Sequence, residues 1–256
     1  MEIASLASGS SGNCFFVSQN NQAILVDAGI SSKKIHESLS QINQDPQAIK
    51  GVFITHEHSD HIKGVDVFAR KYHVPIFATK KTIQNSFICS DESLINEIKN
   101  NESFLFAGFL VQAFSKSHKA ADPVSFSISN KKKNLSIITD AGKACKNIAS
   151  QIASSDFLCL ESNHDPKMLQ NGPYPYFLKQ WIKSDTGHLS NLQASLAVLE
   201  HADKKLKHVL LSHLSESNNT PNLAFKTFKN IIKERSDLFP EVSISPRHLP
   251  TSLFKI

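Results

Sequence analysis

Three histidines and two acidic residues stand within six consecutive positions of this chain, His56-Glu57-His58-Ser59-Asp60-His61. The segment directly follows the apolar run 51–55, and a short apolar run bounded by polar residues predicts a buried strand. The segment therefore lies at the carboxyl end of a strand, where open α/β sheets usually place their ligands. This density of imidazole and carboxylate groups predicts a metal site rather than a polar surface loop.

The spacing inside the segment predicts how its side chains are divided between metal ions. If the chain stays extended after the strand, His56 and His58 point to the same side, because side chains alternate with a period of two. Asp60 and His61 come one turn later, at the start of an expected helix. The segment can therefore offer two imidazoles to one metal ion, and a carboxylate plus an imidazole to a second.

Length and composition are those of an ordinary globular protein. The chain has 256 residues, of which 40% are apolar and 20% charged. Its four cysteines form no CxxC pair, which argues against a zinc ribbon or a disulfide framework, and we expect a reducing, cytoplasmic setting. No apolar run approaches membrane-spanning length, so no membrane partner is expected. The net charge of +5 permits an anionic substrate without requiring one.

Several apolar runs end in a residue that can bind a metal or transfer a proton. These endings are Asp27, His56, Asp140, Glu161 and His213. One such ending means little, since core strands normally run out into polar turns, but five indicate that several strands converge on one site. The remaining candidates, His118 and His188, lie in polar loops. No internal repeat or linker is visible, and we predict a single domain over residues 1–256.

Other stretches carry weaker signals. The lysine run within 130–134 is interpreted as a solvated turn between two strands rather than as a nucleic-acid contact. Residues 80–100 are expected to be helical but irregular. Five histidines have no ligand-like surroundings and are predicted to be surface or core residues: His36, His73, His201, His208 and His248.

The order of these motifs resembles the metallo-β-lactamase-fold hydrolases, and within them the YycJ/WalJ type, which is related to ribonuclease Z and to the phosphodiesterases of phosphonate breakdown. The hexapeptide 56–61 carries the superfamily resemblance, while the stretches SGSSGN and ESNHD point to the narrower type. The matching stretches span nearly the whole chain: 6–13, 27–29, 55–64, His118, 139–142, 161–165, 187–191 and 212–215. The resemblance implies an α/β fold, a four-layer αββα sandwich of two mixed β-sheets flanked by helices.

The resemblance also implies a site with two divalent metal ions, zinc or manganese, with iron as a further candidate. It assigns His56, His58 and His118 to the first ion, Asp60, His61 and His213 to the second, and Asp140 as a bridge between them. Two ions about 3.5–4 Å apart can lower the pKa of a shared water to about 7 and stabilise both oxygens of a displacement at phosphorus. In the family, the bridging hydroxide attacks the phosphorus opposite the leaving oxygen.

The leaving oxygen needs a proton. His188 resembles the histidine that ribonuclease Z-like enzymes use for this step, and Glu161 aligns with the glutamate that orients it. A carboxylate bound to one imidazole nitrogen sets the tautomer of the ring and stabilises its charged form. With Asp60, these two residues form the expected catalytic set. The simpler alternatives are a loop contact for His188 and a helix cap for Glu161.

A further group of residues is expected around the metals or at the substrate phosphate. Asp27 is predicted to orient a ligand histidine, with a plain turn as the alternative. The loop 8–13 can present N–H groups and hydroxyls to a phosphate, although it can equally be a simple connector. Its candidate residues are Ser8, Ser10 and Asn13. Ser215 is a weaker candidate for the same role, and His164 belongs to the ESNHD stretch without an assigned chemistry.

Two features differ from the pattern of the relatives. Lys119 follows His118, where relatives tend to carry an acidic residue, and this concerns the surroundings of the metals rather than the number of ligands. The chain has no obvious extended arm for gripping transfer RNA. A DNA or RNA end is therefore a better substrate prediction than a long structured RNA.

We expect a binuclear-metal-dependent phosphodiesterase that acts on nucleic acid, specifically a 5′-to-3′ DNA exonuclease with a repair role, as the narrower type suggests. One alternative is the hydrolysis of a small phosphodiester or a thioester, although thioester hydrolases need no pair such as Glu161 and His188. A second alternative is a non-catalytic metal-binding regulatory module, against which the complete ligand set argues. DNA is the expected partner, and a homodimer is left open.

Overall fold

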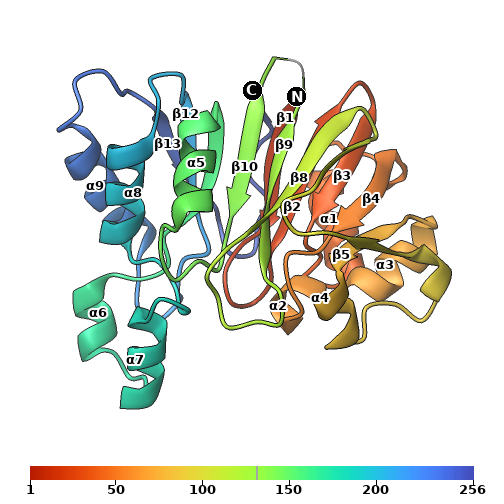
Figure 1. Cartoon of the computed structure of the whole chain (residues 1–256), viewed down its shortest axis with the longest axis horizontal. Helices are drawn as coiled ribbons and strands as arrows, with labels where there is room; N and C mark the ends of the chain where they lie inside the picture. Colours follow the sequence, from red (N-terminus) through yellow and green to blue (C-terminus); the bar gives the residue numbers. More distant parts are fainter. Residues whose placement is uncertain (131) are drawn as a thin grey trace. The chain divides into compact units, whose positions relative to one another are not determined.

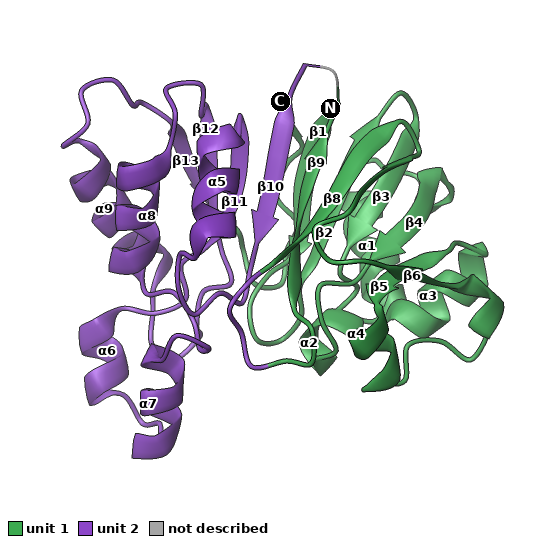
Figure 2. Cartoon of the chain, in the orientation of Figure 1, with its two compact units in different colours: residues 1–115, 120–131, 245–256 green, residues 116–119, 132–244 purple. Residues whose placement is uncertain are grey.

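The computed structural model describes residues 1–130 and 132–256 (Figure 1). The chain divides into two compact units (Figure 2). Unit 1 comprises 1–115, 120–131 and 245–256, and unit 2 comprises 116–119 and 132–244. The turn predicted at 130–134 contains Lys131, which lies outside the described residues. The single domain predicted for 1–256 stays a prediction.

Unit 1 contains a mixed sheet in the order β14-β1-β2-β3-β4-β5-β6. Its strands are β1 (Glu2–Ala7), β2 (Cys14–Gln19), β3 (Gln22–Val26), β4 (Ile49–Phe53), β5 (Ile76–Thr79), β6 (Ile95–Ile98) and β14 (Phe254–Lys255). Strands β14 to β3 pair antiparallel, and β3 to β6 pair parallel. Asn20 and Asn21 both have positive φ, as the two-residue turn of a tight β-hairpin requires.

Three more strands of unit 1 pair antiparallel: β7 (Ser103–Phe106), β8 (Phe109–Ser115) and β9 (Val124–Ser129). They pack against the first sheet through phenylalanines. The ring of Phe53 on β4 stacks on Phe77 at 4.7 Å and meets Phe106 and Phe126 edge-on, each at 5.6 Å. This aromatic cluster therefore holds two layers of strands together directly before the histidine-rich segment.

The helices of unit 1 are α1 (Ser32–Gln41), α2 (Ser59–Ile62), α3 (Val65–Tyr72) and α4 (Lys80–Gln84), with short 3-10 turns at Pro46–Ala48 and Glu92–Leu94. Helix α1 starts where its cap predicts, because the side chain of Ser31 accepts the N–H of Lys34. The expectation of an irregular helix over 80–100 is wrong beyond α4, since 95–98 forms the edge strand β6. Short apolar runs do not distinguish a strand from a helix by periodicity alone.

Unit 2 contains four parallel strands in the order β13-β12-β11-β10. They are β10 (Asn134–Ile138), β11 (Phe157–Glu161), β12 (His208–Ser212) and β13 (Glu241–Ile244). Helices α5 (Lys146–Ser154), α8 (Asn191–His201) and α9 (Pro221–Ile232) pack side by side against these strands (Figure 1). Helices α6 (Pro166–Asn171) and α7 (Tyr176–Lys183) precede α8. The carboxyl ends of parallel strands meet at one edge, so the residues that follow β10, β11 and β12 come close together.

The α/β fold with mixed β-sheets and flanking helices is confirmed within these units. No helix among residues 1–130 and 132–256 is long and apolar enough to cross a membrane.

The aromatic cluster of unit 1 predicts a large effect on stability. Phe53 is fully buried, and we expect Phe53→Ala to lower the free energy of unfolding by about 3–5 kcal/mol, because it opens a cavity between two layers. Urea unfolding followed by circular dichroism measures this change. Phe87→Ala, at a side chain that is 69% exposed, is the matched control. Equal unfolding midpoints for the two variants would contradict the prediction.

Candidate metal centre

The histidine-rich segment of unit 1 begins at His56, three residues after the last residue of β4, and turns into α2 at Ser59. His56 and His61 are fully buried, and His58 is half-buried. The nitrogens His56 Nε2 and His58 Nδ1 lie 3.0 Å apart. The two imidazoles therefore converge on one point, as the period-two spacing of the sequence predicts.

Two neighbouring loops fix the backbone of this segment. The N–H of Asn13 donates to the carbonyl of Asp60, and the N–H of Ala28 donates to that of His61, both at 2.8 Å. At Gly29 a Cβ atom would collide with the carbonyl of Asp60. Glycine is required here because the loop after β3 runs in backbone contact with the metal motif.

A buried carboxylate holds the second half of the segment. Asp27 Oδ2 lies 2.7 Å from His61 Nδ1 and accepts the hydroxyl of Thr55 at 2.9 Å. Asp27 Oδ1 accepts the backbone N–H of Thr55 at 2.8 Å. Asp27 therefore fixes the ring orientation of His61 and leaves His61 Nε2 directed toward other groups.

The loop 8–13 lies against the same histidine. Asn13 Nδ2 is 3.2 Å from His61 Nε2 and 3.4 Å from Asp60 Oδ2. Asn13 Oδ1 accepts the N–H of Gly9 at 2.9 Å. Ser8 is buried, whereas Ser10 is exposed. Asn13 thus touches the metal motif, and Ser10 is the candidate of this loop that is open to a ligand.

Unit 2 brings four predicted residues together at the carboxyl ends of strands β10, β11 and β12 and in the loop before α8. One ligand atom from each lies within 4.8 Å of the others, and the four are Asp140, Glu161, His188 and His213. Asp140 Oδ2 is 3.1 Å from His213 Nδ1, and Asp140 Oδ1 is 3.7 Å from His188 Nδ1. Asp140 is therefore the carboxylate at the centre of this group.

Glu161 and His188 form a close pair. His188 Nδ1 donates to Glu161 Oε1 at 2.7 Å, and the carboxylate is fully buried. Glu161 Oε2 accepts the backbone N–H groups of Ala141 and Leu189, at 2.8 and 3.2 Å. Glu161 is not a helix cap, because the side chain of Asp165 caps α6. The pair defines the tautomer of His188, with Nε2 as its second ring nitrogen.

His118 also belongs to unit 2. Its Nδ1 donates to the carbonyl of Gly187 at 3.1 Å, and its Nε2 lies 3.9 Å from Asp140 Oδ1. Burial lowers the pKa of His118 to about 3. The ring is therefore neutral at pH 7, with the lone pair on Nε2, which is the form that binds a metal ion.

Three of the predicted residues have an unusual backbone conformation. Asp27, Asp140 and His213 each follow a strand and have φ of 60°, 52° and 55°. Positive φ is uncommon in residues other than glycine, although Asp and His tolerate it better than most. Such conformations cluster at functional sites, because the surrounding structure must enforce them.

Ser215 and His164 gain no chemical role from their surroundings. Ser215 Oγ accepts the N–H of Asn218 at 3.2 Å, within a turn. His164 is buried, and its Nδ1 has no hydrogen-bond partner among the described residues. Burial lowers the pKa of His164 to about 4, so its ring is neutral at pH 7. These observations assign no chemistry to either residue.

Sequence reasoning missed two residues that touch the site. Thr55 Oγ1 lies 2.9 Å from His56 Nδ1 and thereby joins His56 to Asp27. The ring of Trp181 on α7 lies 5.4 Å from that of His188, in edge-to-face geometry. Thr55 could have been found from its place between the strand and the histidines, but no local signal marks Trp181.

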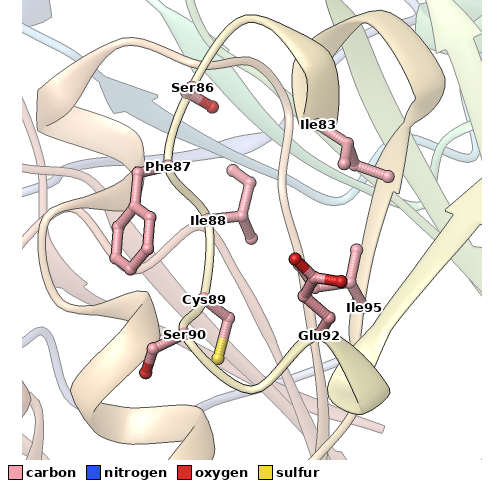
Figure 3. A pocket seen from close by; sticks show the side chains of 8 residues that line it. All are labelled: Ile83, Ser86, Phe87, Ile88, Cys89, Ser90, Glu92 and Ile95. Carbon is pink, nitrogen blue, oxygen red and sulfur yellow. The ribbon is translucent and has the colours of Figure 1, made fainter.

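A pocket of unit 1 lies apart from all of these residues. Phe87, Cys89 and Glu92 are among the side chains that line it, and none of the predicted site residues does so (Figure 3). The candidate site is therefore defined by its ligand groups rather than by this pocket.

The donor sets fit divalent metal ions. Two nitrogens bound to one zinc ion at about 2.0–2.1 Å in tetrahedral geometry lie roughly 3.3 Å apart, and the separation of His56 Nε2 and His58 Nδ1 is close to this, at 3.0 Å. In unit 2, Asp140 Oδ2 and His213 Nδ1 approach in a similar way. Buried imidazole nitrogens and carboxylate oxygens that converge in this manner are typical of zinc, manganese and iron sites.

Comparisons with known proteins place these residues in a family context. The protein-family model for the β-lactamase superfamily domain matches residues 22–214 of this chain. The chain is 36% identical over 243 residues to exodeoxyribonuclease YycJ of Bacillus anthracis, covering 92% of this chain and 90% of that protein. It is 38% identical over 230 residues to exodeoxyribonuclease WalJ of Streptococcus pneumoniae serotype 2, covering 88% and 86%.

Among solved structures, the metallo-β-lactamase-fold protein YhfI of Bacillus subtilis superposes with a TM-score of 0.73 over 98% of both chains, at 15% identity. At this level of identity the likeness shows the fold alone. It confirms the metallo-β-lactamase fold that the sequence predicted.

The contacts of Asp27 predict its effect on metal binding. We expect Asp27→Asn to weaken metal affinity roughly 10- to 100-fold, because the carboxylate that orients His61 and increases its basicity is lost. Competition with a chromophoric chelator measures the affinity. Glu37→Gln, at an exposed acidic residue of the same unit, is the control. Unchanged affinity in Asp27→Asn would show that Asp27 only shapes the turn.

Proposed function

Because the chain belongs to the β-lactamase superfamily, we propose that it is an exonuclease that hydrolyses phosphodiester bonds of DNA. A metal-dependent hydrolase is the coarser description that the family and the grouped His and Asp residues support. The DNA substrate rests on the two exodeoxyribonucleases that the chain resembles over most of its length. The observation that carries the proposal is the Glu161–His188 pair beside Asp140 and His213.

The proposed metal ligands are the seven residues of the family pattern. His56, His58 and His118 would hold one ion, Asp60, His61 and His213 a second, and Asp140 both. When bound, two such ions supply Lewis acidity and an activated water at cellular pH. Zinc and manganese are the proposed ions, with iron as a third candidate, because the donors are imidazoles and carboxylates without thiolates.

The residues of the chain itself supply the proton. Glu161 fixes the proton of His188 on Nδ1, at 2.7 Å, so Nε2 is the nitrogen that gives a proton to the leaving oxygen as the P–O bond breaks. The buried carboxylate stabilises the charged imidazole before the transfer. The backbone N–H groups of Ala141 and Leu189 hold that carboxylate in place.

Several finer features belong to the same proposal. We propose 5′-to-3′ polarity, a role in repair, and one domain over 1–256, all carried by the resemblance to the narrower type. Ser10 is the preferred phosphate contact of the loop 8–13, because Ser8 is buried and Asn13 is engaged with Asp60 and His61. A cytoplasmic location agrees with the four cysteines, which are free thiols in this structure.

The first test is a nuclease panel. Wild-type protein with manganese or zinc should release mononucleotides from 5′-phosphorylated single-stranded DNA, and EDTA should stop the reaction. His58→Ala should abolish it, because an imidazole donor is lost. Gel analysis of oligonucleotides labelled at either end measures rate and polarity.

The same panel separates the rival functions. Turnover of a bis-aryl phosphate without any degradation of DNA or RNA would favour a small-molecule hydrolase. Bound metal without turnover of either substrate would favour a regulatory module.

The second test isolates the proton donor. We expect His188→Gln to lower kcat roughly 10²- to 10⁴-fold, because general acid catalysis is lost, while the metal content measured by atomic emission stays that of the wild type. His201→Gln, at a partly exposed histidine of α8, should change neither quantity. Loss of metal in His188→Gln would instead make His188 a ligand.

A further inference from the structure

Helices α6 and α7 form a small helical pair in unit 2 (Figure 1). The side chain of Lys179 on α7 donates to the carbonyl of Gln170 on α6 at 2.9 Å, which ties the two helices together. The segment 166–183, here called the α6–α7 surface, contains none of the proposed metal ligands or catalytic residues. Its exposed side chains therefore have no role yet assigned.

Two neighbouring aromatic rings of this surface face solvent. Tyr176 is 77% exposed and Phe177 is 74% exposed, at the first two positions of α7. Single exposed apolar residues are common on protein surfaces and need no explanation. Two large adjacent rings at such exposure offer flat apolar faces to a partner.

The charge of the surface indicates the kind of partner. Residues 166–183 include three lysines, Lys167, Lys179 and Lys183, and no acidic residue. The flanking carboxylates are engaged, because Asp165 caps α6 and Asp185 pairs with Lys143 at 2.7 Å. Exposed aromatic faces next to lysines without acidic neighbours match a polyanion that carries aromatic groups, which is the chemistry of single-stranded nucleic acid.

The surface is directly connected to the Glu161–His188 pair. Phe177 and Trp181 are four residues apart on α7, so they share one face of the helix and differ by about 6 Å along its axis. The ring of Trp181 contacts that of His188 at 5.4 Å. The N–H of His188 also donates to the carbonyl of Ile182 at 2.9 Å. The last turn of α7 therefore fixes the distance from Phe177 to the proposed proton donor.

We propose that the α6–α7 surface binds the single-stranded DNA next to the phosphodiester that is cleaved, with Tyr176 and Phe177 stacked on unpaired bases and Lys183 near a phosphate. This inference rests on the proposed nuclease function for the identity of the strand. Stacking of this kind tolerates any base, because every base has an aromatic face. It requires an unpaired strand, since the faces of bases within a duplex are already stacked.

Binding to a non-hydrolysable strand tests the stacking. The probe is a fluorescein-labelled phosphorothioate oligothymidylate, followed by anisotropy with the metal-loaded protein. We expect Phe177→Ala, and separately Tyr176→Ala, to raise Kd roughly 5- to 100-fold, and Phe177→Tyr to restore binding because it keeps a ring. Phe239→Ala, at an aromatic residue of unit 2 that is 81% exposed, is the matched control and should bind as the wild type does.

An abasic strand with the same backbone separates stacking from charge. Phe177→Ala should bind this strand as the wild type does, because no base is present to stack. Equal losses on both strands, or no loss on either, would overturn the proposal. Sedimentation of the wild type as a dimer and of Phe177→Ala as a monomer would also overturn it. The surface would then be a contact between copies of the chain.

The salt dependence of binding tests the lysine. Lys183→Gln should reduce the slope of log Kd against log salt by roughly 0.7, because one phosphate contact of a single strand is lost. Lys205→Gln, at an exposed lysine of the same unit, should leave the slope unchanged. An equal slope in Lys183→Gln would remove Lys183 from the proposal.

Different results would disprove this inference and the proposed nuclease function. If wild-type protein degrades DNA while Phe177→Ala binds the strand normally, the nuclease function stands and the surface does not. If Phe177→Ala loses binding while wild-type protein degrades no DNA, the surface stands and the nuclease function does not.

Discussion

Two buried carboxylates at strand ends hold His61 and His188 in place. Asp27 follows β3 and binds His61 Nδ1 together with the backbone N–H of Thr55. Glu161 ends β11 and binds His188 Nδ1 together with two backbone N–H groups. A buried carboxylate is costly unless its oxygens are hydrogen-bonded, and here both oxygens of each have donors. The hydrogen bonds that offset the cost of burial also fix the orientation of each ring. Any metal or proton chemistry of these histidines depends on that orientation.

The sheets explain where these carboxylates lie. Strands β10, β11 and β12 are parallel, so their carboxyl ends lie at one edge of the sheet. Asp140, Glu161 and His213 lie close together at that edge. Positive φ at Asp140 and His213 turns the chain sharply as each strand ends. The same conformation occurs at Asp27 in unit 1. A tightly turned polar residue at a strand end therefore occurs in both units: at Asp140 and His213 in unit 2, and at Asp27, which orients His61, in unit 1.

Helix α7 links the proposed proton donor, His188, with the surface proposed to bind nucleic acid. Trp181 packs on His188, and the carbonyl of Ile182 accepts its backbone N–H. Exposed rings begin the same helix at Tyr176 and Phe177. A helix fixes distances better than a loop, so α7 would hold the proposed proton donor at a set distance from the proposed DNA-binding rings.

The sequence by itself determined the ligand types and the local geometry of the hexapeptide 56–61, because the direction of neighbouring side chains follows from the strand and helix periods. It also determined that Asp27, Asp140 and Glu161 stand at the carboxyl ends of strands, because a short apolar run has visible limits. Only the tertiary structure decided that 95–98 is an edge strand, because strand pairing outweighs local propensity.

Contacts between distant residues were likewise decided by the fold. Thr55 and Asp27 are 28 positions apart and share two hydrogen bonds, and Asn13 reaches His61 across 48 positions. Trp181 is found beside His188 because α7 folds back on the loop that follows it. Such contacts depend on how elements pack, and no spacing along the chain encodes them.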